Sequence, residues 1–299
     1  MGVSLHVKGA QAPPLIAISI SVTVYPLQQR QIDLPGGQTM FRVRLFIGLL
    51  VLLAAPVGLA SDLEKEKRWA DQIVDALIEG EAVWFTVDGR KVLAIFTEAE
   101  EPDSKLAAII VHGIGVHPNW QQVVYPLRTG LPSRGWNTLS LQMPILPNEA
   151  DPAEYAAIID EVGPRLDAGI AFLRERGFDK VVIIGHSLGS TMTAYYLATG
   201  DHGVAGFVAI GMPDGIPNSD IQNAEMVPKI TAPMLDLYGS DDSPDVLAAV
   251  PQREKVKSAG SGGPYWSRSV EGANHFFDGK EDALVETVDA WLRTSVVGS

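Results

Sequence analysis

The chain has 299 residues, of which 46% are hydrophobic, with a net charge of −13 and no cysteine. This length and composition allow a large buried core, which we expect to belong to one domain. The acidic charge disfavours nucleic acids and anionic membrane surfaces as partners. The lack of cysteine excludes disulfides, thiolate metal sites and a lipid-modified N-terminal cysteine.

Residues 40–60 have the pattern of a bacterial secretory signal peptide. A short basic start leads into an apolar run, which ends in small residues at the positions read by a signal peptidase, Gly58 and Ala60. An uncleaved anchor is the alternative, but residues 45–60 fall short of the roughly 20 residues that a spanning helix needs. We therefore expect cleavage after Ala60, a periplasmic or secreted location, and no stable membrane insertion afterwards.

Residues 1–39 precede this leader, although a signal peptide belongs at the N-terminus. Gly36 and Gly37 would be encoded by a G-rich stretch just before the Met40 codon, where a bacterial ribosome-binding site would lie. We therefore interpret Met40 as the true start. Residues 1–39 are then no part of the mature protein, whose domain comprises residues 61–299.

The mature chain begins with patterns typical of an amphipathic helix and a hairpin. Ser61 and Glu64 have the spacing of a capping box ahead of apolar residues at helical intervals. Strand-like residues 82–87 and 91–97 follow, and the Asp-Gly dipeptide between them is a strong hairpin signal. The sequence therefore predicts a helix followed by two antiparallel strands.

Further strands and helices alternate towards the C-terminus. The predicted strands are residues 106–111, 136–141, 181–184, 206–210, 234–238 and 265–270. The predicted helices are residues 123–131, 164–176, 190–199 and 245–257, with a closing helix that contains Leu284, Val288 and Trp291. This alternation predicts an α/β fold with a doubly wound, mostly parallel sheet and helices on both faces. Residues 211–233 are too few to form a large lid domain.

Gly185, Ser187 and Gly189 follow a buried strand with the Gly-x-Ser-x-Gly spacing of a nucleophile elbow. In such an elbow the serine occupies a sharp, strained turn between strand and helix, and the glycines avoid clashes that a Cβ would cause. The pattern alone also fits a glycine-rich packing turn. The strand before it and the predicted helix after it favour Ser187 as a nucleophile.

A serine nucleophile needs a base, and the base needs a carboxylate that holds it in the correct tautomer. His275 follows the last predicted strand, whereas Asp241 and Asp242 follow residues 234–238. The chain order is therefore serine, aspartate, histidine, as this arrangement requires. Adjacent side chains on a turn diverge, so only one aspartate can meet the imidazole, and Pro244 would stiffen the loop beside Asp242.

The loop after residues 106–111 reads His112-Gly113-Ile114-Gly115. Its glycines allow backbone N–H groups to approach a developing oxyanion closely, and its place in the chain order suits that role. An ordinary connection between a strand and a helix is the alternative. We expect His112 to order this loop through hydrogen bonds rather than to take part in catalysis.

From about Trp69 to the C-terminus the chain resembles the α/β-hydrolase superfamily. It is similar to a proteobacterial branch of unknown function in the stretches at residues 112–120 and 139–144. The resemblance implies the nucleophile Ser187, the base His275, an acid three residues beyond the strand-ending glycine at Asp242, and an oxyanion hole from the backbone of Leu188 and of Gly113 or Ile114. It implies no metal and no organic cofactor.

Apolar and aromatic residues in the loops around these positions predict a partly apolar pocket for a small acyl substrate. Its candidate lining residues are His117, Trp120, Met143, Met212 and Phe276. For His117 and Trp120 a packing role is an equal alternative. The histidines are scattered over separate loops, so the sequence gives no sign of a metal site.

The sequence therefore predicts a serine hydrolase of the esterase, thioesterase or lipase type that acts on an acyl substrate. The alternative is a binding or scaffold protein on the same fold with weak or no catalysis, because a fold alone does not determine a function.

Overall fold

The computed structural model describes residues 60–298 except residue 261. Residues 1–39 and the leader up to residue 59 lie outside the described residues. The predictions of a start at Met40 and of a signal peptide therefore stay predictions.

The strands form an eight-stranded sheet in the order β1-β2-β4-β3-β5-β6-β7-β8. Their bounds are β1 Glu81–Val87, β2 Arg90–Thr97, β3 Leu106–Val111, β4 Asn137–Leu141, β5 Lys180–His186, β6 Gly206–Ile210, β7 Met234–Gly239 and β8 Tyr265–Val270. The β1–β2 and β2–β4 pairs are antiparallel, and all other neighbouring pairs are parallel. The mostly parallel sheet that the sequence predicts is confirmed.

The turn between β1 and β2 has the backbone conformation that its Asp-Gly dipeptide predicts. Asp88 has a φ of 49° and Gly89 a φ of 74°. Two consecutive positive φ values match the right-handed twist of the flanking strands, so they favour a tight antiparallel hairpin. Val87 and Arg90 accordingly pair directly across the turn.

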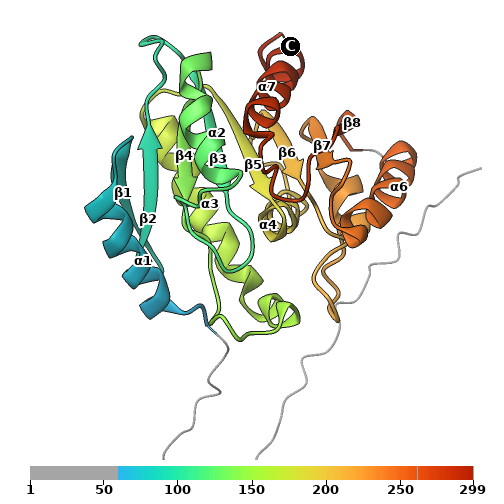
Figure 1. Ribbon diagram of the computed structural model, residues 1–299, viewed down its shortest axis with the longest axis horizontal. Helices are drawn as coiled ribbons and strands as arrows, with labels where there is room; N and C mark the ends of the chain where they lie inside the picture. The colour runs from blue at the N-terminus through green and yellow to red at the C-terminus, as the bar shows by residue number, and fades with distance from the viewer. Residues whose placement is uncertain (1–59, 261, 299) are drawn as a thin grey trace, which may run out of the picture. The chain divides into compact units, whose positions relative to one another are not determined.

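Helices cover both faces of the sheet, as Figure 1 shows. They are α1 Leu63–Ala76, α2 Val124–Gly130, α3 Val162–Glu175, α4 Leu188–Leu197, α5 Asn223–Met226, α6 Pro244–Ala259 and α7 Glu281–Leu292. Consecutive residues of a strand point to opposite faces. Ile109 of β3 thus belongs to the apolar cluster that includes α3 and α4, whereas Ile110 belongs to the cluster that includes α2 and α7.

The start of α1 differs from the prediction in one residue. Asp62, not Ser61, is the N-cap, and its carboxylate accepts a hydrogen bond from the Lys65 N–H at 2.9 Å. Ser61 does not cap the helix because its hydroxyl donates to the carboxylate of Glu161 at 2.8 Å.

A 3-10 helix, η2 (Pro152–Glu161), precedes α3 and was not predicted. At its capping box, the carboxylate of Glu154 accepts a hydrogen bond from the Asp151 N–H at 3.1 Å, and the carboxylate of Asp151 accepts one from the Ala153 N–H at 2.8 Å. The connection from β6 to β7 contains only α5 and the short 3-10 turn Val227–Lys229, so the prediction of no large lid is confirmed. No helix in the described part of the chain is long and apolar enough to cross a bilayer.

Candidate active site

Ser187 stands between β5 and α4 with a φ of 54° and a ψ of −124°. A non-glycine residue in such a conformation stores roughly 1–3 kcal/mol of strain, which the surrounding structure must support. A Cβ on Gly185 would lie 2.6 Å from the carbonyl oxygen of Gly189, and one on Gly189 would lie 2.6 Å from that of Val111. Both clashes are with backbone, so this turn requires glycine at both positions.

A hydrogen bond of 2.7 Å joins Nδ1 of His275 to Oδ1 of Asp242. Asp242 follows β7 and is 5% exposed, whereas the neighbouring Asp241 is an exposed residue. The carboxylate of Asp242 also accepts hydrogen bonds from the N–H groups of Ser243 at 2.7 Å and Gly239 at 3.3 Å. Three donors therefore fix its orientation towards the imidazole.

Burial by itself raises the pKa of Asp242. The hydrogen bond and charge of His275, followed by the N–H groups of Ser243 and Gly239, outweigh burial and leave the pKa below its ordinary value. An ionised carboxylate only accepts hydrogen bonds, so the proton of the neutral imidazole resides on Nδ1. Nε2 of His275 then carries the free lone pair of a base.

The turn after β6 brings the serine and the histidine to the same edge of the sheet. The Ser187 N–H donates to the carbonyl oxygen of Ile210 at 2.8 Å. The next residue, Gly211, has a φ of 54°, and a Cβ there would lie 3.0 Å from the His275 ring and 3.4 Å from Asp242. No hydrogen bond joins Ser187 Oγ to His275 among the described residues.

His186, the last residue of β5 and the neighbour of Ser187, packs against His275. Its Nε2 donates to the carbonyl oxygen of His275 at 3.0 Å, and the two ring centroids are 4.9 Å apart. Burial, with a smaller contribution from the charge of His275, lowers the pKa of His186 to about 4. The ring is therefore neutral at pH 7 and does not oppose a positive charge on His275.

His112 orders the loop after β3. Its Nε2 accepts hydrogen bonds from the Met143 N–H at 2.9 Å and the Gln142 amide at 3.1 Å, so its Nδ1 donates to the carbonyl oxygen of Gly113 at 2.9 Å. Burial lowers the pKa of His112 to about 3, which keeps the ring in this neutral tautomer. A Cβ on Gly113 would lie 3.2 Å from Cβ of Ser187, so glycine permits the close approach of this loop to the serine.

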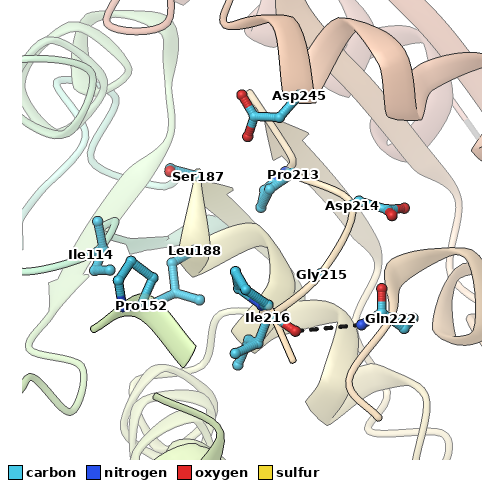
Figure 2. A pocket seen from close by; sticks show the side chains of 11 residues that line it. Ile114, Pro152, Ser187, Leu188, Pro213, Asp214, Gly215, Ile216, Gln222 and Asp245 are labelled. Atoms are coloured by element: carbon cyan, nitrogen blue, oxygen red, sulfur yellow. Dashed lines mark hydrogen bonds between the residues drawn. The ribbon is translucent and has the colours of Figure 1, made fainter. Parts of the chain in front are cut away.

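A cavity of about 470 Å³ opens beside Ser187. Its apolar lining comes from Ile114, Pro152, Leu188, Pro213, Ile216 and Pro217. Figure 2 shows Ser187, Leu188 and Ile114 on the same side of this space, with Ile216 across from them. Leu188 is the first residue of α4, so its N–H has no acceptor within the helix. The cavity thus places the serine beside two of the three residues predicted for the oxyanion hole.

The five side chains predicted to line a pocket are not among those that line this cavity. Met143 and Met212 are fully buried in the apolar core, and they were misassigned because loop residues need not be exposed. The ring of His117 packs against Trp69 of α1 and against Trp120, with centroids 5.1 and 5.6 Å away. Burial lowers the pKa of His117 to about 4, which fits the packing alternative.

Phe276 is 41% exposed and lies against His275, with ring centroids 5.1 Å apart. It flanks the imidazole rather than the cavity. The loop after β6 supplies much of the lining of the cavity, including Pro213 and Ile216, which were not predicted to line a pocket. The sequence feature that could have indicated this loop is the presence of two prolines and a glycine within residues 213–217, shortly after a predicted strand.

The described residues contain no group of three or more His, Asp or Glu side chains that could hold a metal ion. Ser187, His275 with Asp242, and the nearby backbone N–H groups give this edge of the sheet a hydroxyl, an imidazole paired with a carboxylate, and hydrogen-bond donors. Acyl transfer to the hydroxyl is the reaction class that uses all three.

Solved structures with the same architecture come from several organisms. Est1E from Butyrivibrio proteoclasticus has a TM-score of 0.59 at 15% identity and covers 73% of this chain and 100% of its own. An esterase from Pyrococcus furiosus has a TM-score of 0.60 at 14% identity, with 75% and 94% covered. A serine hydrolase without a lid from Xanthomonas campestris has a TM-score of 0.56 at 18% identity, with 73% and 95% covered. The chain therefore has the α/β-hydrolase fold.

No curated protein sequence matches this chain. The model of a family described as a protein of unknown function, DUF3530, matches residues 53–164 and 147–294. These two matches cover most of the described residues, including the serine, the aspartate and the histidine above. The chain belongs to the DUF3530 family.

Proposed function

We propose that this protein is a serine hydrolase that cleaves a small acyl ester or thioester, with Ser187, His275 and Asp242 as its catalytic triad. The observation that carries the proposal is the 2.7 Å hydrogen bond from His275 to a buried Asp242, at the sheet edge where Ser187 occupies a strained turn. The esterase from Pyrococcus furiosus, which shares this fold, supports the proposal.

In the acylation step, Oγ of Ser187 attacks the acyl carbon while Nε2 of His275 takes its proton. The charge of Asp242 stabilises the imidazolium that forms. Backbone N–H groups of Leu188 and of Gly113 or Ile114 stabilise the oxyanion, which collapses as His275 returns the proton to the departing alcohol or thiol. The described residues show no hydrogen bond between Ser187 and His275. This is compatible with the acylation step above, because catalytic hydrogen bonds often tighten only in the substrate complex.

In the deacylation step, water attacks the acyl-serine while His275 takes one of its protons. The tetrahedral intermediate then releases the carboxylic acid, and His275 returns a proton to Oγ of Ser187. Bonds and protons balance over the two steps, since one water molecule is consumed for each ester cleaved.

The cavity favours an uncharged substrate with an apolar acyl group. Its lining is mostly aliphatic, and its volume of about 470 Å³ suits a small molecule. The exposed carboxylates of Asp214 and Asp245 on its lining disfavour anionic substrates. Ferulic acid is bound to Est1E in another solved structure with this fold, so a hydroxycinnamate ester belongs among the substrates to test.

The test compares wild-type protein with Ser187→Ala on p-nitrophenyl esters of graded chain length, and on methyl ferulate. We expect the substitution to lower kcat by several orders of magnitude, because loss of a triad nucleophile has this effect in serine proteases. The Tm should stay nearly unchanged, since the Ser187 hydroxyl forms no hydrogen bond with the described residues that the substitution would remove. A serine-directed phosphonate should label the wild type and not the variant.

Wild-type turnover by Ser187→Ala would exclude the mechanism. Failure of the wild-type protein both to hydrolyse the esters and to react with the phosphonate would instead favour a binding or scaffold protein on this fold.

We also propose, from the leader pattern at residues 40–60, that the protein acts in the periplasm or outside the cell. Fractionation of cells that express the full chain tests this location.

A further inference from the structure

The chain changes from exposed to buried at the peptide bond between Ala60 and Ser61. Ala60 is exposed, whereas Ser61 is only 6% exposed. The N–H and hydroxyl of Ser61 both donate to the carboxylate of Glu161, at 3.1 and 2.8 Å. The next N–H, that of Asp62, donates to the carbonyl oxygen of Ile145 at 2.7 Å. Within the described part of the chain, the first buried residue is therefore the one that follows the predicted cleavage point.

Glu161 ends η2 and takes part in a buried ionic cluster. Arg165 of α3 forms a two-pronged ion pair with Glu66 of α1, at 3.0 and 3.1 Å, and reaches Glu161 at 3.3 Å. Arg90 of β2, which is partly exposed, reaches Glu161 at 3.1 Å. Because the guanidinium of Arg165 is engaged mainly by Glu66, Glu161 retains oxygen acceptors directed at Ser61.

Burial by itself raises the pKa of Glu161. Hydrogen bonds from the hydroxyl and N–H of Ser61, followed by the charges of Arg165 and Arg90, outweigh burial and hold the pKa below its ordinary value. The carboxylate facing the nitrogen of Ser61 is therefore ionised at neutral pH. A peptide N–H offers this carboxylate a neutral donor, whereas an ammonium group at the same place would add the Coulomb attraction of a unit positive charge.

We infer that Glu161 binds the α-ammonium group of Ser61, which is produced when the peptide bond between Ala60 and Ser61 is hydrolysed. Water supplies the hydroxyl that completes the carboxylate of Ala60, and the new amine of Ser61 takes up a proton at neutral pH. The nitrogen already lies 3.1 Å from Oε1 of Glu161 and needs no movement to form the ion pair. Since Ala60 is exposed, its removal lets the other ammonium protons face water.

The charge of the α-ammonium group of Ser61 determines whether the stability of the folded chain rises or falls with pH. An ordinary α-amino group has a pKa of about 7.7–8.0, and a carboxylate partner in the folded state raises it. Glu161 accepts from the nitrogen itself, and Arg165 donates to the hydroxyl of Ser61 at 3.3 Å. Arg90 and Glu66 lie one contact further away, paired with Glu161 and Arg165 respectively. Stability from the ion pair is thus fully present below pH 7.7 and is lost as the pH rises through the higher pKa of the folded state.

The test uses the full chain, exported and processed by a bacterial host, whose first residue is identified by N-terminal sequencing. The comparison chain carries Gly-Ser inserted between Ala60 and Ser61, so that the nitrogen of Ser61 remains an amide after processing. We expect the natural chain to begin at Ser61 and the extended chain to melt about 2–6 °C lower at pH 7. The difference should disappear above about pH 10.

The same comparison is repeated with Glu161→Gln in both chains. Without the carboxylate, the natural and extended chains should melt within about 1 °C of each other. Glu175→Gln, at the exposed end of α3, should retain the full difference. Where Glu161→Gln fails to fold, the acetylation rate of the α-amine against pH replaces it. That rate should report a pKa above 8 in the natural chain and an ordinary value in the extended chain.

A first residue other than Ser61, equal melting of the natural and extended chains, a difference that persists in Glu161→Gln, or an unshifted α-amine would each overturn the inference. These measurements concern stability and the N-terminus only. They therefore remain informative even if the protein proves to have no esterase activity.

Discussion

Two adjacent aspartates follow β7, and only Asp242 faces the imidazole of His275. We expect Asp242→Asn to lower kcat by up to about ten-thousand-fold, as in serine proteases, because the amide can leave the histidine in the wrong tautomer. Asp241→Asn should retain nearly full turnover, since this side chain is exposed and, among the described residues, its carboxylate accepts a hydrogen bond only from the Ser240 hydroxyl. Steady-state kinetics on the best ester of the panel would measure both.

A larger loss in Asp241→Asn than in Asp242→Asn would contradict the roles assigned to the two residues. In the sequence, Asp242 was favoured by the resemblance to α/β-hydrolases, which places the acid three residues beyond the glycine that ends β7, and by the proline at position 244. Both are local features. The lining of the cavity depends on tertiary packing instead. Met143 and Met212 looked available in loops, but both are packed in the core.

At the scale of secondary-structure elements, the turn after β6 and the loop after β8 meet at Gly211. We expect Gly211→Ala to displace His275, because the added Cβ would lie 3.0 Å from its ring. The variant should therefore lose at least tenfold in kcat. Gly279→Ala is the matched control, since its φ of 68° carries a similar strain with nothing within 4 Å of the new Cβ. Kinetics and thermal melting of both variants separate displacement from strain.

Equal kcat losses in Gly211→Ala and Gly279→Ala would show that backbone strain, and not the contact with His275, is responsible.

The strands and the hairpin could be predicted because buried β-branched runs and an Asp-Gly dipeptide are local signals. The 3-10 helix η2 was missed, although Asp151 and Glu154 have the spacing of a capping box in the sequence. The N-cap of α1 could not be assigned, because the hydroxyl of Ser61 binds a carboxylate 100 residues away.

At the scale of the whole molecule, buried histidines link stability to pH. Burial lowers the pKa of His112 to about 3 and that of His186 to about 4, against an ordinary value near 6.5. The unfolded chain takes up protons below pH 6.5 that the folded chain cannot bind. This contribution to stability is therefore present above pH 6.5 and is lost as the pH falls towards 3–4.

We expect the free energy of unfolding to fall between pH 6.5 and pH 5 with a slope that approaches about 1.4 kcal/mol per pH unit for each such histidine. Urea unfolding at pH 7, 6 and 5 measures this slope. His186→Asn should reduce it by the share of one histidine. A free energy of unfolding that is flat from pH 7 to pH 5 would contradict the neutral, buried state of these rings.

The docking of Ser61 against Glu161 has a practical consequence for recombinant work. An affinity tag fused directly ahead of Ser61 would fill the exposed position of Ala60 and leave an amide where we infer an ammonium group. A tag after Val297, which is 39% exposed, leaves that contact untouched. Protein purified through an N-terminal tag would therefore understate the heat resistance of the processed chain.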